Sequence, residues 1–200
     1  MQIKQIYAAY DQTKHPPADK FKYCPFCTTQ LISKPSGNKP RPTCPACGFI
    51  QFKNPAPALS VLVVQGDKVL LGKRSGAPGA GKWSFPSGYV EYEDDFLTTA
   101  IKEVKEETGL DVEIVSIINL VSSFLSPRFH FLSPYLLARV LGGELAARDD
   151  LEAVDWFPLS GPLPDMAFQE DIDVLDMVAA GEFESLPVDP RFARPGKSDR

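Results

Sequence analysis

The chain has 200 residues, enough for one full hydrophobic core and a small second module but too few for two full domains. Hydrophobic residues make up 44% and charged residues 24%, as in an ordinary globular protein, and no apolar run approaches the roughly 20 residues of a membrane-spanning helix. The first residues lack the apolar core and cleavage site of a secretory signal, so we expect a cytoplasmic protein without membrane contact.

The net charge of −5 is distributed unevenly along the chain. Residues 1–55 carry eight lysines and arginines against two aspartates, a net charge of +6. The remainder carries 13 basic against 24 acidic residues, a net charge of −11. This asymmetry indicates two modules. The acidic main body argues against duplex nucleic acid as the principal partner, and its acids are better explained if some of them hold cations.

The local composition of the chain predicts four segments. Residues 1–20 indicate a leader or short helix that ends at a proline pair, and residues 21–53 hold too few apolar side chains to form their own core. A hinge at Asn54-Pro55 opens the main domain, residues 54–186. The polar, proline-containing segment 187–200 is expected to be a disordered tail.

Residues 21–53 contain two C-x2-C pairs, separated by 16 residues: Cys24, Cys27, Cys44 and Cys47. Zn²⁺ prefers four soft ligands in a tetrahedron, and each pair supplies two thiolates from one tight loop. Two disulfides or four unrelated thiols are the alternatives, but this spacing in a cytoplasmic chain favours metal. The sequence therefore predicts a small zinc ribbon whose Zn²⁺ site is structural, because all four positions are filled by protein.

The main domain alternates strand-like runs with two helical patterns, an α/β composition. The first two runs flank a short turn and predict a hairpin. The strand-like runs lie at 59–64, 68–74, 112–125, 129–141 and 151–157, with a turn at Gly142-Gly143. A second helix is expected near residues 167–180.

The strongest helical pattern covers residues 95–107. Its apolar residues recur with the period of one helix face: Leu97, Ala100, Ile101 and Val104. Asp94 or Asp95 can cap the start of this helix, and Gly109 can cap its end.

The same helix carries Glu103, Glu106 and Glu107 on one face. Like charges at these spacings repel by roughly 0.2–0.5 kcal/mol per pair, and the helix dipole disfavours anions in the last turn by about 0.3–1 kcal/mol each. Lys102 and Lys105 can offset part of this repulsion, and Mg²⁺ or Mn²⁺ would offset it better. A solvated charged face is the alternative when the helix is considered alone.

The segment from Gly88 to Leu110 resembles the Nudix signature: a glycine, five residues, a glutamate, seven residues, then Arg-Glu-apolar-x-Glu-Glu-x-Gly-apolar. All intervals match, and the two substituted positions are Asp94 for glutamate and Lys102 for arginine. Gly109 occupies the last glycine position. With its preceding cysteine pairs, the chain is similar to the zinc-ribbon branch of the Nudix superfamily. That branch includes NADH pyrophosphatase-like enzymes and ADP-ribose or FAD pyrophosphatases.

The resemblance implies an α/β/α sandwich around a mixed sheet and a metal-dependent pyrophosphohydrolase. Its substrate would be a nucleoside diphosphate linked to another moiety, such as ADP-ribose, FAD or a related dinucleotide, and a nucleoside monophosphate would be released. Glu106 and Glu107 are expected to hold the principal Mg²⁺ or Mn²⁺, and Glu103 to bind metal or help deprotonate water. Lys102 keeps the positive charge of the arginine and loses its bidentate fork. The Ser-Gln-Pro-Trp-like array of NADH-type members is absent from residues 121–134.

Two acids after the signature, Asp150 and Glu152, are further candidates for a base or metal ligand, with ordinary loop charge as the alternative. Aromatic residues could sandwich a base, although the alternation of two of them favours core packing. These aromatic residues are Phe124, Phe129, Phe131 and Tyr135.

Two other functions remain open. A non-catalytic nucleotide sensor would explain the two substitutions in the signature. An RNA 5′-end or cap pyrophosphohydrolase would bind nucleic acid through residues 1–55, whose net charge is +6. However, few exposed aromatic–basic clusters are expected in the ribbon. A nucleic-acid partner is therefore not expected, and the sequence leaves a homodimer open.

Overall fold

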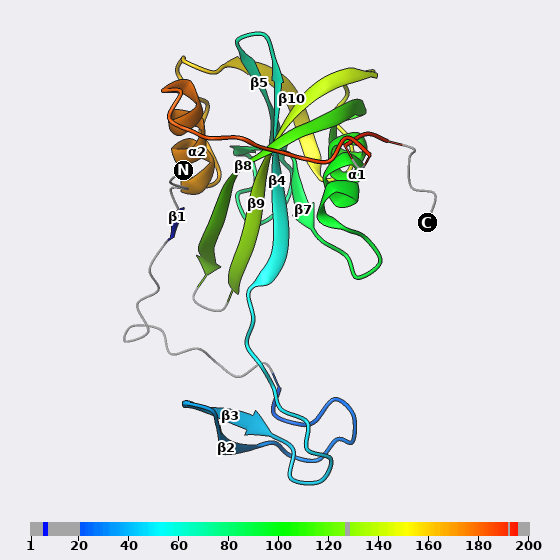
Figure 1. The fold of residues 1–200 in the computed structure, drawn as a ribbon, viewed down its shortest axis with the longest axis vertical. Coiled ribbons are helices and arrows are strands. Elements are labelled where there is room, and N and C mark those ends of the chain that lie inside the picture. The colour runs from blue at the N-terminus through cyan, green and yellow to red at the C-terminus, as the bar shows by residue number, and fades with distance from the viewer. Residues whose placement is uncertain (1–5, 8–20, 127–128, 192, 196–200) are drawn as a thin grey trace.

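The structure, a computed structural model, describes residues 6–7, 21–126, 129–191 and 193–195 (Figure 1). The leader or short helix expected over residues 1–20 lies largely outside this part of the chain. Its described portion, Ile6–Tyr7, is a short strand (β1) rather than a helix. This strand pairs in parallel with β8 (Leu110–Ser126), at the edge that faces away from β9.

Within the described residues, nine strands form one mixed sheet with the order β1-β8-β9-β4-β5-β10. Outside this path, β11 pairs with β8, β6 with β5 and β7 with β4. The predicted hairpin is present as β4 and β5, and β4 also lies parallel to β9. The remaining strand bounds are β4 (Ala56–Gln65), β5 (Lys68–Arg74), β6 (Trp83–Ser84), β7 (Ser87–Tyr89), β9 (Phe129–Gly143), β10 (Leu151–Pro158) and β11 (Leu186–Pro187).

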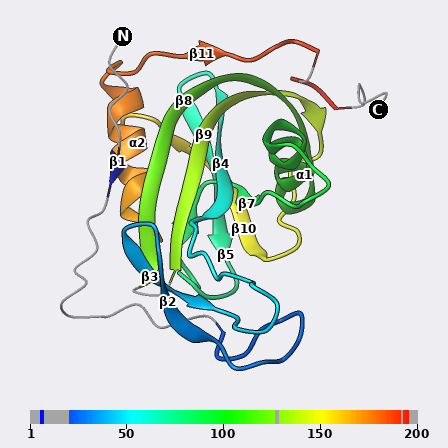
Figure 2. The same ribbon diagram turned by 60° about the horizontal axis from the view of Figure 1, so that its bottom comes forward.

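Two helices, α1 (Phe96–Thr108) and α2 (Gln169–Ala179), lie on opposite sides of this sheet (Figure 2). The Asp95 side chain caps α1 by accepting the backbone N–H groups of the second and third helical residues, at 3.0 and 3.1 Å. Gly109 ends α1 in the left-handed region, as predicted, with φ of 75°. No helix in the described ranges is long and apolar enough to cross a membrane.

The central strand β4 is apolar on both faces because each face is covered by a helix. Val61 and Val63 belong to the core cluster that includes Ala100 of α1. Leu62 points the other way, into the cluster that includes Val174 of α2. Alternation of side chains along one strand therefore fills two separate cores. The α/β/α sandwich predicted from the sequence is confirmed.

The turn predicted at Gly142-Gly143 differs from the structure. Gly142 and Gly143 do not form a free turn but close β9, where they pair with Asp111 and Leu110 of β8. A Cβ on Gly143 would lie 2.5 Å from the backbone oxygen of Gly109, so the glycine permits a close approach to the end of α1.

In the segment expected to be a disordered tail, the structure describes residues 187–191 and 193–195, and these residues contact β8. Strand β11 pairs with β8, and the Ile114 N–H donates to the Ala193 carbonyl at 2.8 Å. Arg194 donates to Glu113 at 2.6 Å. The edge of β8 thus supplies backbone and carboxylate partners for this segment, which its polar composition does not reveal.

The cysteine-containing segment folds as a two-stranded hairpin, β2 (Ile32–Ser36) and β3 (Lys39–Thr43), between two cysteine knuckles. It lies outside the sandwich, at the end where β4 begins (Figure 1). Thr28 and Gly48 hold equivalent knuckle positions, with φ of 58° and 78°. Each donates its backbone N–H to the first cysteine carbonyl of its pair. The second knuckle thus uses a glycine, whereas the first accommodates a threonine in the same conformation.

Candidate active site and cysteine cluster

A pocket of about 300 Å³ opens between the end of α1, the start of α2 and the inner ends of β4 and β9. Its lining is strongly acidic, with Arg74 as the one cation among the lining residues. The acids that line it are Glu91, Glu103, Glu107, Asp149, Asp150, Glu170 and Asp171. So many carboxylates around one hollow repel each other unless protons or cations intervene.

Glu107 is the most deeply placed of the three signature glutamates, with 3% of its surface exposed. Burial raises the pKa of Glu107 to about 9, and repulsion from Asp150 and Glu103 adds to the rise. The Ser87 N–H opposes this shift by donating to the Glu107 carboxylate at 3.3 Å. In the absence of a cation, Glu107 therefore favours its protonated form near neutral pH.

Glu103 lies one turn earlier and is half-buried. Burial raises the pKa of Glu103 to about 7, helped by repulsion from Glu106 and then Asp149. A Cβ on Gly88 would lie 1.9 Å from the Glu103 carboxylate, so the signature glycine leaves room for this side chain. Glu106 itself is exposed and does not line the pocket.

The two candidates after the signature are separated by the structure. Asp150 lines the pocket, and its Oδ1 is buried without a hydrogen-bond partner while Oδ2 lies 3.6 Å from Arg74. Glu152 lies outside the pocket lining and forms an ion pair with Lys73 at 3.3 Å. The unpartnered Oδ1 makes Asp150 a candidate ligand for a cation in the pocket.

The two departures from the Nudix signature contact each other. Lys102 Nζ lies 2.6 Å from Asp94 Oδ2, and this contact raises the pKa of Lys102. Lysine therefore pairs here with the shortened first acid of the signature. The pair ties the loop before α1 to the middle of the helix.

Asp171, at the start of α2, belongs to the pocket although its sequence context gave no sign of it. It is 2% exposed, and its two oxygens accept from the Tyr135 hydroxyl at 2.7 Å and the Phe85 N–H at 3.2 Å. Burial raises the pKa of Asp171 to about 7. In sequence it is one of several acids on an amphipathic helix. Only its contacts with Tyr135 and Phe85 in the folded chain distinguish it.

The aromatic residues considered for base stacking fall into two groups. Phe129, Phe131 and Tyr135 line the pocket, and Phe131 and Tyr135 are also part of the core beneath it. Phe124 instead stacks on His130, with ring centroids 4.2 Å apart. Core packing and pocket lining are thus combined in the same side chains, because the inner face of β9 forms the pocket wall.

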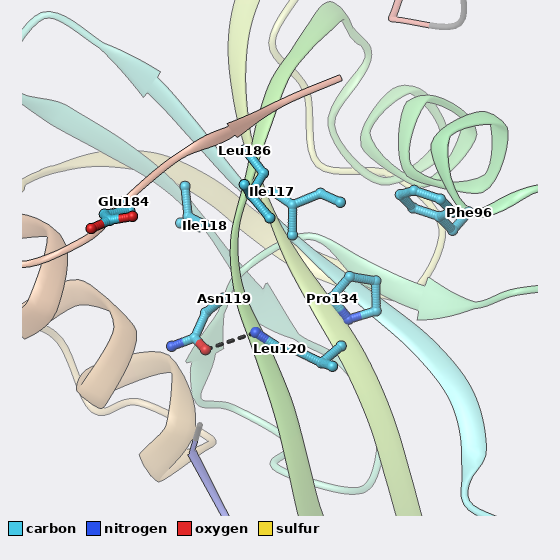
Figure 3. A pocket seen from close by; sticks show the side chains of 8 residues that line it. All are labelled: Phe96, Ile117, Ile118, Asn119, Leu120, Pro134, Glu184 and Leu186. Carbon is cyan, nitrogen blue, oxygen red and sulfur yellow. Dashed lines mark hydrogen bonds between the residues drawn. The ribbon is translucent and has the colours of Figure 1, made fainter. Parts of the chain in front are cut away.

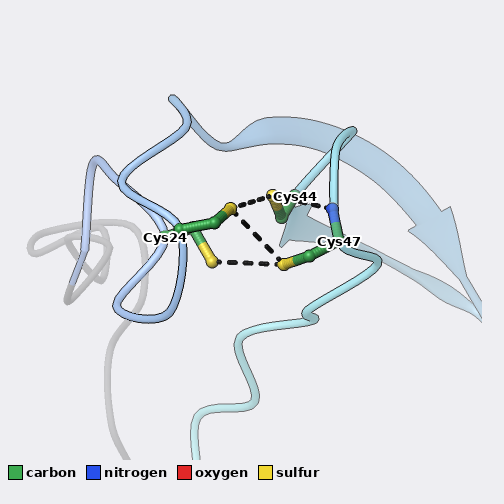
Figure 4. A group of neighbouring side chains, drawn as sticks. Cys24, Cys44 and Cys47 are labelled. Atoms are coloured by element: carbon green, nitrogen blue, oxygen red, sulfur yellow. Dashed lines mark hydrogen bonds between the residues drawn. The ribbon is translucent and has the colours of Figure 1, made fainter.

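The four cysteines are free thiols gathered into one cluster (Figure 4). Their sulfur atoms all lie within 4.8 Å of one another, a spacing suited to one ion. In the part of the chain that the structure describes, no other group of three or more His, Cys, Asp or Glu side chains meets this criterion. The four cysteines form no disulfide with one another in the structure, and the signature glutamates do not meet the same criterion.

A second hollow, of about 330 Å³, lies between the start of α1, β8 and β11 (Figure 3). Phe96, Ile117 and Leu186 line it, and Asn119 turns its amide oxygen back to the Leu120 N–H at 2.7 Å. This hollow is almost wholly apolar and contains none of the signature acids. It is therefore not the candidate active site.

The sandwich, the signature helix and the acid-lined pocket together define a Nudix-type hydrolase. The comparison with family models agrees: the NUDIX domain matches residues 54–178. The chain belongs to the Nudix family.

Relatives of known name cover most of the chain. An ADP-ribose pyrophosphatase of Methanocaldococcus jannaschii is 34% identical over 126 residues, 62% of this chain and 74% of that protein. The NAD-capped RNA hydrolase NudC of Pseudomonas aeruginosa is 31% identical over 146 residues, 72% of this chain and 50% of that protein. The chain thus spans about half the length of this second relative.

Solved structures share the fold. A NUDIX hydrolase from Nitrosomonas europaea superposes with a TM-score of 0.71 at 28% identity, covering 80% of this chain and 91% of that one. A MutT NUDIX hydrolase from Burkholderia pseudomallei gives a TM-score of 0.57 at 26% identity, covering 63% and 99%.

Proposed function

We propose that this protein is a metal-dependent pyrophosphohydrolase acting on a nucleoside diphosphate linked to another moiety. ADP-ribose, FAD and related dinucleotides are the expected substrates, and a nucleoside monophosphate is one product. The observation that carries the proposal is the burial of Glu103 and Glu107 in one pocket with Asp150. Relatives named ADP-ribose pyrophosphatase and NAD-capped RNA hydrolase support this substrate class.

The residues of the pocket fit a hard divalent cation. Glu107 is buried, and Asp150 has an oxygen without a partner, so both gain from a positive charge between them. Glu103, Glu106 and Glu107 would hold Mg²⁺ or Mn²⁺. The exposed position of Glu106 suits a ligand at the solvent side of such a site. When bound, the metal would neutralise pyrophosphate charge and lower the pKa of the attacking water.

Asp150 is the base that we propose in preference to Glu152, which its ion pair with Lys73 holds outside the pocket lining. The unpartnered Oδ1 of Asp150 can accept the proton that the attacking water loses. Arg74, at the same wall, can donate to a phosphate oxygen of the substrate. The aromatic wall formed by Phe129 and Tyr89, whose centroids are 6.0 Å apart, can receive the base or other planar moiety.

The four cysteines fit one Zn²⁺ held by four thiolates, with no position left for a catalytic water. We assign residues 21–53 to the ribbon and 54–186 to the hydrolase domain. The ribbon has no described hydrophobic core cluster of its own, so the metal would supply the stability that apolar burial does not.

One alternative is favoured by a specific observation. Several relatives are named NAD-capped RNA hydrolase, so the dinucleotide could be the 5′ end of an RNA instead of a free compound. The chemistry in the pocket would be unchanged, because the cleaved bond is still a pyrophosphate.

The test is to incubate the purified protein, with Mg²⁺ and separately with Mn²⁺, against ADP-ribose, FAD, NADH, dinucleoside polyphosphates and capped RNA. We expect metal-dependent release of a monophosphate that the Glu106→Gln/Glu107→Gln variant loses. Glu152→Gln is the matched control, because it removes an acid near Asp150 but outside the pocket lining. Tight ligand binding without turnover of any compound would instead identify a nucleotide sensor and overturn the proposal.

A further inference from the structure

The β2–β3 hairpin concentrates positive charge on one face. In its antiparallel register Lys34 lies opposite Arg41, and Ser36 lies opposite Lys39. Directly opposite residues project from the same side of a sheet, and alternate residues along a strand share that side. Lys34, Lys39 and Arg41 therefore share one face, which we name the basic face together with Phe52. The other face carries Ser33 and the strand prolines.

Charge on the basic face is not balanced within the ribbon. Lys34 and Arg41 form a like-charged cross-strand pair, an arrangement that destabilises a hairpin. Residues 21–53 contain five lysines and arginines and no acid. Within the described ranges, no salt bridge joins Lys34, Lys39 or Arg41 to a carboxylate. Four thiolates around Zn²⁺ would add a net −2, which still leaves a net charge of +3.

An exposed aromatic ring stands beside these charges. Phe52 is 56% exposed, and the Arg41 guanidinium lies over its ring, 4.7 Å from the centroid. Tyr23 and Phe26 are 59% and 79% exposed on the same small module. The sequence predicted few aromatic–basic clusters in the ribbon, and Arg41 with Phe52 forms one of them. The composition hid the cluster because Arg41 and Phe52 are eleven positions apart, and the fold brings them together.

We propose that the basic face binds single-stranded nucleic acid. Lys34, Lys39 and Arg41 contact backbone phosphates, and Phe52, held by Arg41, stacks on an unpaired base. Cations with an exposed ring are the two elements of such sites, since phosphates supply the charge and every base has a π face. A duplex would use the cations alone because its bases are already stacked. An acidic protein segment would likewise leave the ring without a defined role.

The ribbon lies close to the pocket along the chain. Phe52 is six residues before Ala58, which lines the pocket, so their Cα atoms are at most about 22 Å apart. At the rise of about 3.4 Å per nucleotide of a stacked strand, this distance spans on the order of six nucleotides. A strand on the basic face can thus extend to the pocket. Binding at the face does not itself depend on the proposed hydrolysis and is measured without turnover.

The experiment measures binding of the zinc-loaded full chain to a fluorescent 12-nucleotide RNA with a 5′-hydroxyl, which has no pyrophosphate to cleave. Fluorescence anisotropy at several salt concentrations gives affinity and salt dependence. Each phosphate contact on a single strand contributes a slope of about −0.7, so three contacts predict about −2. We expect Lys34→Gln/Lys39→Gln/Arg41→Gln to remove most of this slope. Phe52→Ala should weaken binding at least fivefold, as loss of one base–aromatic stack does.

The matched control is Lys68→Gln/Lys82→Gln/Arg191→Gln, which removes the same charge from exposed sites outside the ribbon. It should leave the salt slope nearly unchanged. The zinc content of every variant is measured. If the triple variant loses zinc, the double variant Lys34→Gln/Lys39→Gln replaces it, because it leaves the Arg41–Phe52 stack intact. Single-stranded DNA of the same sequence shows whether the sugar matters.

Three results would overturn the proposal. The first is absence of binding to both single strands. The second is equal weakening by the control variant, which would show a nonspecific charge effect. The third is equally tight binding, insensitive to Phe52→Ala, of duplex or of a polyglutamate peptide, which would make the face a general anion or protein site. ADP-ribose turnover is assayed separately, so failure here is distinguishable from failure of the proposed hydrolysis.

Discussion

The cysteine cluster and the carboxylate pocket are built by different means. Four cysteines within 24 residues meet through two knuckles, each closed by its own backbone hydrogen bond. The pocket instead gathers acids from α1, the loop before β10 and α2, which only the sandwich brings together. With a bound Zn²⁺ the cluster would stabilise the segment that carries it, whereas the crowded carboxylates of the pocket lower the stability of the metal-free sandwich.

The comparison predicts opposite responses to metal removal, and this is the largest effect expected. Cys44→Ser, or a zinc chelator, should unfold residues 21–53, because structural zinc contributes on the order of 10 kcal/mol to folding of such modules. The hydrolase domain should remain folded on its own two core clusters. Limited proteolysis should cut the ribbon and leave a resistant fragment beginning near residue 54. Unfolding of the ribbon and the hydrolase domain together would contradict their independence.

The second prediction concerns Asp150, just before β10, and Glu152 on β10. Asp150→Asn should lower kcat by about 100-fold, the low end of what a general base contributes. Glu152→Gln should change kcat less than about twofold, because Glu152 contacts Lys73 outside the pocket lining. Both rates are measured on the best substrate at saturating metal. An equal loss of kcat in the two variants would contradict the placement of Asp150 inside the pocket and Glu152 outside it.

The third prediction follows from the pKa of Glu107, raised from 4.5 to about 9 by burial. The folded state keeps a proton that the unfolded chain loses above about pH 4.5, so stability of the metal-free protein should fall as pH rises toward 9. Glu103, with its pKa raised to about 7, adds to the fall at lower pH.

Glu107→Gln removes the buried charge, so its Tm at pH 8.5 without metal should exceed that of the wild type by on the order of 5 °C. Differential scanning fluorimetry from pH 5 to 9 measures this, with Glu152→Gln as the control. Added Mg²⁺ should raise the Tm of the wild type at pH 8.5 and leave the Tm of the variant nearly unchanged. A wild-type Tm that stays constant from pH 5 to 9 would contradict the raised pKa of Glu107.

The smallest effect is expected at Asp171. Asp171→Asn leaves one acceptor oxygen for two donors, the Tyr135 hydroxyl and the Phe85 N–H, so one of them loses its partner. Such a loss costs about 1–3 kcal/mol, reduced here by removal of a buried charge. Urea unfolding at pH 7 should show a loss of about 1 kcal/mol, and Tyr135→Phe a smaller one. A more stable Asn variant would show that the charge, not the hydrogen bonds, dominates.

The sequence predicted those features that depend on local spacing. Periodicity placed the helix over 95–107, and Asp95 and Gly109 cap it as expected. The cysteine pairs predicted their own cluster. The approach of Asp150 to Glu107 could be proposed only by position, because the two residues are 43 positions apart and the pairing of β8, β9 and β10 decides which loop reaches the helix.

Features that depend on a partner surface were missed. Asp171 differs from its neighbours on α2 only by what packs against it. The pairing of β11 with β8 depends on the edge that β8 presents, which composition cannot indicate. The basic face depends on hairpin register, since a shift by one residue would place Lys34 and Arg41 on opposite sides.

The most direct test of metal-dependent hydrolysis is a Mg²⁺ titration of monophosphate release, with wild type, Glu107→Gln and Glu152→Gln side by side on the best compound of the substrate panel. We predict no release without metal, saturation with metal, a loss of at least about 100-fold in Glu107→Gln, and nearly full activity in Glu152→Gln. Release that is independent of metal, or undiminished in Glu107→Gln, would contradict the account.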